Sequence, residues 1–473
     1  MPVIARIKHV SIIAVAVALL VGATTLIPPG ASATPSSSLR RYPYLTDLVL
    51  GGVTVNWATT TGIATGSVTY GRSGSESCTA HTVTAKRTAI TVGSTAEYQW
   101  KAVVTGLSRN VAYCYRIQGG GTDLLGSDAS PVFRTQLAAG STATFSFAVI
   151  GDWGFQDTSA LNTDQANIMA RIASSGARFA VTTGDIAYQS GSQTNYGDLV
   201  QTGPYVSEVF GPSYWTVPGA SIPFFNVLGN HGLNSTALTN WPEGRAASSS
   251  SGRYAMETYC CTNGTRSASY PSAWYAFNTG RARFYILDAA WANSNVGTAD
   301  LYKNDHDNHW TTSSDEYEWL AQDLAAHPGG LKFAFFHFPL HSPNSTEKSD
   351  TYLSGADNLE GLLADNGVDV IFNGHAHTYA RSTPEGMPVS YVTGGGGAHL
   401  EPATVCGAPI AAALGWSYSS STHGSSCGSL SRPTSIDQVF HFLLVTVQGG
   451  KNVTVTPTDE QGRTFDVRTY NFG

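Results

Sequence analysis

The sequence predicts an all-β sandwich followed by an α/β domain, itself a two-sheet β sandwich flanked by helices. Residues 39–136 predict the first part, because Thr, Val, Ser and Gly occur there in short alternating runs without a helical period. The α/β domain is predicted by short apolar runs that are typical of buried strands. Five such runs carry the argument: FSFAVI (145–150), FAVTT (179–183), PFFNVL (223–228), KFAFF (332–336) and DVIFN (369–373).

Aromatic residues stand out in the strands of the first part. VTVNWAT (53–59) and AYCYRIQ (112–118) alternate apolar and polar residues, as strands with one buried face do. Their residues Trp57, Tyr113 and Tyr115 are open to two interpretations, a carbohydrate-binding face or the aromatic core of a sandwich. We favour the core, because sandwich interiors commonly use these residues.

Helices and further strands are predicted in the α/β domain. Residues 163–173 have helix-like apolar spacing and predict a crossover helix between the first two apolar runs. A second helix is predicted over residues 314–326, where Ser313 and Glu316 fit a capping box. Two C-terminal strands are expected to complete the second sheet of the domain: VFHFLLVTV (439–447) and NVTVTP (452–457).

A short polar motif follows each of the five apolar runs. These motifs are GDWG (151–154), GDIAY (184–188), GNH (229–231), the isolated His337 and GHAH (374–377). An Asp after a strand is often only a turn residue, and a buried His is often only a core group, so each motif alone is weak evidence. Packing alone does not explain five of them, because strand ends are where α/β domains bind ligands. The set predicts a two-metal hydrolase built from Asp152, Asp185, Tyr188, Asn230, His337, His375 and His377.

In this order the motifs resemble those of the calcineurin-like metallophosphoesterases, and within that family they resemble the purple acid phosphatases. Tyr188 is the discriminating residue, since most metallophosphoesterases lack this tyrosine. The resemblance covers the whole mature chain, and residues 39–136 are similar to the fibronectin type III-like domain of larger purple acid phosphatases. Gly232 departs from the family pattern, which commonly has an acidic residue after GNH.

The resemblance also implies a binuclear metal centre with one ferric ion and one divalent ion, either zinc, iron or manganese. It assigns the ferric site to Asp152, Tyr188 and His377, the divalent site to Asn230, His337 and His375, and the bridging position to Asp185. Hard anionic donors suit a trivalent ion, while imidazoles and a neutral amide leave the second ion Lewis-acidic. A metal-bound hydroxide would then attack phosphorus in line.

The leaving alkoxide needs a proton, and the sequence offers two candidates for the catalytic acid. His231 and His341 both lie in the motif regions without being required as metal ligands. His341 is open to a second interpretation as a surface-loop histidine, because HFPLHS is a Pro-containing turn.

The function expected from these features is hydrolysis of small phosphate monoesters by a secreted acid phosphatase. Two alternatives stay open on the same site, a phosphodiesterase and a nucleotide pyrophosphatase, because all three reactions use the same metals and differ in the pocket walls. A third alternative, of another class, is a non-catalytic secreted binding or adhesion protein, and it predicts gaps in the ligand set.

The 473 residues predict three segments: 1–33, 39–136 and 143–473. The first is expected to be a secretory signal, because Arg6 and Lys8 precede an apolar stretch and Ala31-Ser32-Ala33 is a typical cleavage site. An uncleaved anchor is the alternative; after cleavage no stable membrane association is expected. Cleavage lowers the Lys and Arg count from 26 to 24 against 33 Asp and Glu, a net charge of −9, which argues against nucleic-acid binding.

Six cysteines in an exported chain favour disulfides. Cys78 and Cys114 stand alone in the N-terminal domain and are expected to pair. The remaining four allow three connectivities: Cys260, Cys261, Cys406 and Cys427. A direct bond between the adjacent Cys260 and Cys261 would be strained, so we favour bonds from these two to the 406–427 loop. A cysteine zinc site is not expected, because no CxxC spacing occurs.

Three minor motifs have local interpretations. DHDNH (305–309) lacks the glycine and acidic terminus of a calcium loop and is expected to be solvated. The glycines 394–397, followed by His399, would let the backbone approach the site. Four sequons are glycosylation sites only in a host that glycosylates exported proteins: Asn234, Asn263, Asn344 and Asn452.

Overall fold

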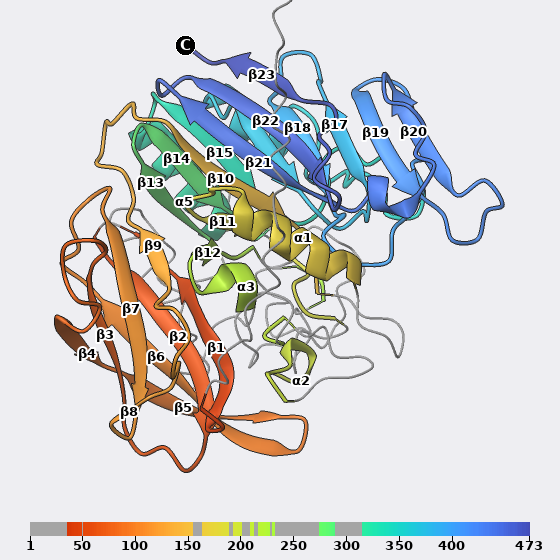
Figure 1. Ribbon diagram of the computed structural model, residues 1–473. Coiled ribbons are helices and arrows are strands. Elements are labelled where there is room, and N and C mark those ends of the chain that lie inside the picture. Colours follow the sequence, from red (N-terminus) through yellow and green to blue (C-terminus); the bar gives the residue numbers. More distant parts are fainter. Residues whose placement is uncertain are drawn as a thin grey trace, which may run out of the picture.

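The structure is a computed structural model, which describes residues 36–49, 51–154, 163–188, 193–200, 209–211, 216–227, 229–231, 274–288 and 315–473. The expected signal segment and the DHDNH run lie outside these residues, so the expectations placed on them stay predictions. Cys260 and Cys261 also lie outside the described residues. Within the described ranges, no helix combines the length and the apolar character needed to span a membrane. Figure 1 shows the N-terminal β domain below the larger C-terminal domain, which contains the five motifs and is called the catalytic domain for the activity that they predict.

The N-terminal domain is an all-β sandwich, as predicted. One face contains β1 (Leu39–Thr46), β2 (Val53–Thr60), β6 (Thr95–Val104) and β5 (Lys86–Val92). The other contains β4 (His81–Thr84), β3 (Gly66–Arg72), β7 (Ala112–Gly119), β8 (Thr122–Asp123) and β9 (Val132–Arg134). Trp57, Tyr113 and Tyr115 are all buried, and Trp57 stacks on Trp100 at 6.1 Å between ring centroids. The core interpretation of these aromatics is therefore confirmed.

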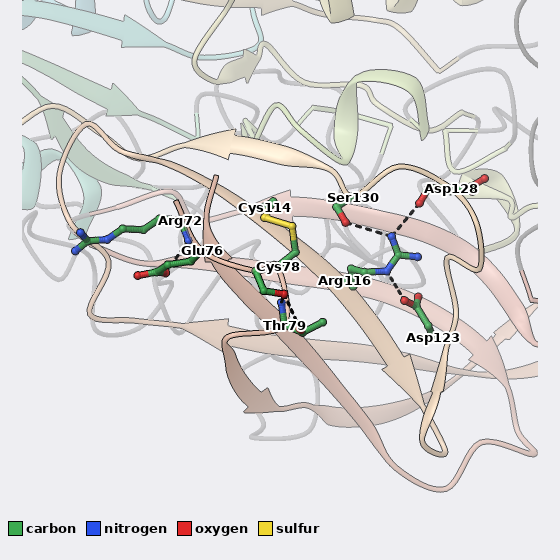
Figure 2. Close-up of a disulfide and its surroundings, with 10 residues drawn as sticks. Arg72, Glu76, Cys78, Thr79, Cys114, Arg116, Asp123, Asp128 and Ser130 are labelled. Carbon is green, nitrogen blue, oxygen red and sulfur yellow. Dashed lines mark hydrogen bonds and ion pairs between the residues drawn. A yellow bond between two sulfur atoms is a disulfide. The ribbon is translucent and has the colours of Figure 1, made fainter. Parts of the chain in front are cut away.

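The predicted disulfide between Cys78 and Cys114 is confirmed, with a Cα–Cα distance of 5.2 Å (Figure 2). It links strand β7 to the loop that precedes β4. Figure 2 also shows Arg116 of β7, which pairs with Asp123 and donates to Ser130 Oγ at 3.2 Å. These contacts hold the β7–β8 turn against the following loop.

The second disulfide corrects the sequence-based expectation. Cys406 bonds to Cys427, with a Cα–Cα distance of 5.4 Å, instead of to Cys260 or Cys261. Cys427 lies in β20 (Gly424–Gly428), which pairs with β19 (Ile410–Trp416), so the hairpin brings it beside the loop that precedes β19. The two thiols are within reach only because of this pairing, which the spacing of the cysteines does not reveal.

The catalytic domain contains two sheets packed face to face. The first includes β10 (Phe145–Ile150), β11 (Ala180–Thr182), β12 (Phe224–Phe225), β21 (His441–Gln448), β22 (Asn452–Asp459) and β23 (Arg468–Asn471). The second includes β13 (Tyr275–Thr279), β14 (Ala282–Ile286), β15 (Leu331–Phe335), β16 (Val370–Asn373), β18 (Val389–Thr393), β17 (Tyr379–Ser382), β19 and β20. The five motif strands are thus divided between the two sheets. The C-terminal strands β21 and β22 join β10 in the first sheet, so the expectation that they complete the second sheet is wrong.

Phenylalanines from both sheets form the core between them. Phe147 of β10 stacks on Phe179 at 5.5 Å and meets Phe333 of the other sheet edge-on at 5.4 Å. All three rings are fully buried. This packing fixes the two sets of strand ends relative to each other.

Both predicted helices form. Helix α1 (Thr163–Ser174) buries Ile168, Met169 and Ile172, and helix α5 (Asp315–Ala326) buries Leu320 and Leu324. Ser313 lies outside the described residues, so the capping box stays a prediction. Shorter helices are α2 (Gln193–Tyr196), α3 (Thr216–Gly219), α6 (Leu359–Asp365) and the 3-10 helix Ile436–Gln438.

The two domains share one ten-stranded sheet. Strand β1 of the sandwich lies parallel to β12 of the catalytic domain, with Thr46 opposite Phe224. The fully buried Arg41 of β1 donates from Nε to the carbonyl of Gly197 at 3.0 Å and from Nη1 to Gln193 Oε1 at 2.8 Å. These bonds join β1 of the sandwich to residues 193–197.

Candidate metal centre

Parallel pairing brings the motifs to the same edge of the molecule. In the first sheet Ile150 of β10 lies opposite Thr182 of β11, so GDWG and GDIAY emerge side by side. In the second sheet Phe335 of β15 lies opposite Phe372 of β16, so His337 and GHAH emerge together. The amide of Gly374 donates to the carbonyl of His337 at 2.9 Å and fixes the second pair.

Three site residues adopt the left-handed backbone conformation. The φ angles are 54° at Asp152, 48° at Asp185 and 69° at His375. This region is uncommon for residues other than glycine, and it concentrates at functional sites, where the surrounding structure holds it. Each of the three lies two or three residues after the end of its strand, which is β10, β11 or β16.

Glycines precede several of the candidate ligands because neighbouring atoms approach too closely to leave room for a side chain. A Cβ on Gly184 would lie 2.6 Å from His337 Nδ1, and one on Gly229 would lie 2.0 Å from Asp185 Oδ1. Such distances exclude any larger residue. The glycines of the motifs therefore allow the candidate ligands to lie close together.

One group of side chains combines Asp152, Tyr188 and His377. The Tyr188 hydroxyl lies 3.0 Å from Asp152 Oδ1 and 3.1 Å from His377 Nε2. His377 Nε2 is itself 3.4 Å from Asp152 Oδ1. The three donor atoms expected at the ferric site thus face one another.

A second group combines Asp185, Asn230, His337 and His375. Asn230 Oδ1 lies 2.8 Å from His337 Nε2 and 3.1 Å from His375 Nδ1. Ligand atoms of Asp185, His337 and His375 all lie within 4.8 Å of one another, close enough to bind one ion. All seven predicted ligands are therefore brought together, in the two groups that the resemblance implies.

The outer nitrogen of each of the three histidines is also hydrogen-bonded. His337 Nδ1 donates to the carbonyl of Thr183 at 2.7 Å, and His377 Nδ1 donates to that of His399 at 2.9 Å. His375 Nε2 lies 2.6 Å from Glu347 Oε2. Such bonds fix the tautomer and leave the inner nitrogen as an electron-pair donor, as in histidines that bind metals. The donor set fits a metal centre.

Burial and neighbouring carboxylates shift the pKa values of side chains in the site. Burial by itself lowers the pKa of His337, but the Asp185 carboxylate raises it to about 9. Burial and then the charges of Asp152 and Asp185 raise the pKa of Tyr188 well above its usual value. Asp185 therefore acts electrostatically on both groups, as expected of a residue between them.

The two candidate proton donors lie in different surroundings. His231 lies on Tyr188, with ring centroids 4.4 Å apart, and its backbone amide donates to Asp185 Oδ1 at 2.8 Å. His341 Nε2 is bound to Glu360 Oε1 at 2.8 Å, so this histidine is anchored and is not a free surface-loop residue. Of the two histidines, His231 contacts two of the candidate metal ligands, Tyr188 and Asp185.

Glu347 is a site residue that the sequence analysis missed. It lies ten residues after His337 in an irregular segment, where no periodicity marks it. Asn344 Oδ1 accepts from the amides of Thr346 and Glu347, and its amide group donates to the carbonyl of Pro402 at 3.0 Å. Asn344 is buried by this arrangement. Asn344 therefore shapes the turn that presents Glu347.

The glycine run 394–397 lies beneath the first group, as expected. Gly396 donates to the carbonyl of Gly151 at 3.1 Å, and Ala398 donates to that of Asp152 at 2.7 Å. A Cβ on Gly396 would lie 2.5 Å from the Gly151 carbonyl oxygen. The backbone of the run supports the turn at Asp152.

Family models match both domains. The model "Purple acid Phosphatase, N-terminal domain" matches residues 44–137, and the model "Calcineurin-like phosphoesterase" matches residues 145–379. The chain belongs to the purple acid phosphatase family. Membership in this family of metal-dependent hydrolases implies a binuclear metal centre, in agreement with the two groups of side chains.

Individual relatives agree with the assignment. Purple acid phosphatase 15 of Arabidopsis thaliana is 25% identical over 318 residues, which cover 62% of this chain and 52% of that protein. Purple acid phosphatase 13 of the same plant is 25% identical over 331 residues, covering 53% of that protein. The chain thus spans about half the length of the curated relatives that it matches. A purple acid phosphatase from yellow lupin (Lupinus luteus) seeds has the same fold, with a TM-score of 0.59 at 16% identity, over 92% of this chain and 75% of that one.

Proposed function

We propose that the chain is a secreted phosphomonoesterase with a binuclear centre of one ferric and one divalent ion. The observation that carries the proposal is the state of the three site histidines, each bonded through its outer nitrogen and aimed with its inner nitrogen at carboxylate, phenol or amide oxygens. The completeness of the ligand set argues against the non-catalytic alternative. The disulfides Cys78–Cys114 and Cys406–Cys427 support export to an oxidising compartment.

Asp152, Tyr188 and His377 would hold the ferric ion, and Asn230, His337 and His375 the divalent ion, with Asp185 shared between them. When bound, the two ions would supply Lewis acidity to the phosphoryl group and activate a water. The residues of the chain orient the ester and handle its proton. His231, beside Tyr188, is placed to give a proton to the departing alkoxide.

Metal analysis combined with visible spectroscopy tests the centre. Iron-loaded protein should contain two metal ions and show a visible absorption band, because a phenolate bound to ferric iron gives a charge-transfer transition. Tyr188→Phe should lose this band while keeping the second ion. A variant that retains the band would refute the assignment of Tyr188 to iron.

Parallel assays on a monoester and a diester separate the activities that share this site. We expect hydrolysis of 4-nitrophenyl phosphate to be faster than that of bis(4-nitrophenyl) phosphate at acid pH. A preference for the diester, or for the anhydride bond of a nucleotide, would replace the proposed reaction with one of the alternatives and leave the metal assignment intact.

A further inference from the structure

A pocket of about 430 Å³ lies at the junction of the two domains, away from the metal centre. On the sandwich side it is lined by β9 and the first residue of β7, and on the catalytic side by the start of β10 and the turn after α1. Figure 1 shows β9 on the side of the sandwich that faces the catalytic domain. None of the candidate metal ligands lines this pocket.

Two arginines from opposite domains meet in the pocket. Arg134 of β9 donates from Nε to Asn110 Oδ1 at 2.9 Å, and Arg178 of the catalytic domain donates from Nη2 to the same oxygen at 3.0 Å. Arg178 also donates to the carbonyl of Thr135. No carboxylate lines the pocket, and within the described part of the chain neither arginine forms an ion pair.

Among the described residues, therefore, no carboxylate compensates the positive charge of this pair. Burial lowers the pKa of Arg178 to about 10, and the charge of Arg134 acts in the same direction. The Nε of Arg178 is buried and finds no acceptor among the described residues. Two guanidiniums that share one neutral acceptor provide a strong site for an anion, because charge-assisted bonds would replace their mutual repulsion.

Apolar side chains complete the pocket. Phe133, Phe145 and Ile222 are almost fully buried in its wall, while Val132 is 41% exposed at its edge. The volume lies in the range of small-molecule sites and exceeds what an inorganic anion needs. The combination of two cations and an apolar wall selects a ligand with a charged head and an apolar body.

We propose that this junction pocket binds a small organic anion, whose phosphate, sulfonate or carboxylate group contacts Arg134 and Arg178 and whose apolar body lies along the wall formed by Phe133 and Val132. Because the two arginines belong to different domains, bound ligand bridges the sandwich and the catalytic domain. The proposal does not depend on the reaction at the metal centre.

Calorimetric titration of the full chain with benzenesulfonate tests the proposal, with inorganic sulfate as the second probe. Benzenesulfonate should bind with one-to-one stoichiometry, and equally to metal-loaded and metal-stripped protein. Sulfate should bind at least about tenfold more weakly, because it lacks an apolar body. Arg134→Gln should weaken benzenesulfonate binding by about tenfold, the worth of one charge-assisted bond. Arg134 is exposed, so this variant should fold, whereas Arg178 also supports Thr135.

Arg87→Gln is the matched control, since Arg87 is an exposed arginine of the same sandwich that lies over Tyr98 outside the pocket. It should bind benzenesulfonate as the unchanged protein does. Absence of saturable binding would overturn the proposal, and so would binding that disappears with the metal or is equally reduced by both substitutions. Sulfate binding as tight as that of benzenesulfonate would overturn the organic class of the ligand.

Discussion

At the scale of single residues, the role of each histidine in the candidate centre follows from which of its atoms contacts the other site residues. The ring of His231 lies against Tyr188, with the two ring planes tilted by 47°, and its backbone amide donates to Asp185 Oδ1. A histidine placed there without a ligand role fits a proton donor or a phosphate contact. Kinetics can separate these two roles.

His231→Ala should retain both metals and lose roughly 10² to 10⁴ in rate on alkyl phosphates, which need a proton on the leaving oxygen. Aryl phosphates should lose less, because their leaving groups are weaker bases. The measurement is kcat across a series of leaving groups together with metal content, with His81→Ala in the sandwich as the control. Equal losses for all esters would assign His231 to phosphate positioning and make His341 the leading candidate for the acid.

Glu347 acts on the centre through His375. Glu347→Gln removes the charge that holds His375 Nε2, so the affinity for the divalent ion should fall by about 10- to 100-fold. Equilibrium dialysis measures this, and excess metal should restore the rate. Glu385→Gln, at an exposed turn, should change neither quantity. If affinity stayed unchanged while the rate fell, Glu347 would contact substrate instead of positioning His375.

At the scale of elements, helices are held to the sheets by apolar faces and, in one place, by a buried ion pair. Arg283 of β14 binds Asp323 of α5 through Nε at 2.8 Å and Nη2 at 2.6 Å, and both side chains are almost fully buried. Arg283 also donates to Asn278 Oδ1 at 3.1 Å. The pair fixes α5 on the sheet whose strand β15 precedes His337.

Arg283→Met should destabilise the protein by about 3 to 5 kcal/mol, because it removes the guanidinium that neutralises the buried Asp323 carboxylate. The double variant Arg283→Met/Asp323→Leu should recover much of this loss, since no charge is then buried. Chemical denaturation measures both, with the exposed Arg281→Met as the control. A double variant as unstable as the single one would show that the packing of Arg283, and not its charge, matters.

At the scale of the whole molecule, the two domains are joined by a continuous sheet and by a polar cluster. Glu97 of β6 is fully buried near Arg40, 3.7 Å away, and beside Asp198. Burial and the neighbouring Asp198 carboxylate raise the pKa of Glu97 to about 8. The protonated form is thus the one that the junction favours.

The stability of the junction should depend on pH in a predictable direction. A carboxyl with a raised pKa in the folded state contributes stability fully below its unfolded pKa of about 4.5 and loses it as pH rises through about 8. Glu97→Gln mimics the protonated form, so it should match the unchanged protein at pH 5 and exceed its melting temperature at pH 8. Glu76→Gln, on the exposed surface of the sandwich, should keep the original pH dependence. If Glu97→Gln and the unchanged protein had the same melting temperature at pH 8 as well as at pH 5, the pKa of Glu97 would not be raised.

The sequence by itself determined the buried strands, the two longer helices and the seven candidate ligands. This was possible because these features depend on local patterns: apolar runs such as FSFAVI, helical spacing around Ile168, and motifs that must follow a strand end. The resemblance to the family rests on the same local patterns. The N-terminal sandwich was predictable for the same reason, because its strands alternate apolar and polar residues.

Only the tertiary structure decided which distant groups meet. The division of the motif strands between two sheets, the bond between Cys406 and Cys427, and the contact of Glu347 with His375 all join segments that no periodicity relates. The meeting of Arg134 with Arg178 likewise requires the two domains to dock. Such contacts result from the packing of whole sheets, whose free energy is spread over many residues, so no short stretch of sequence encodes them.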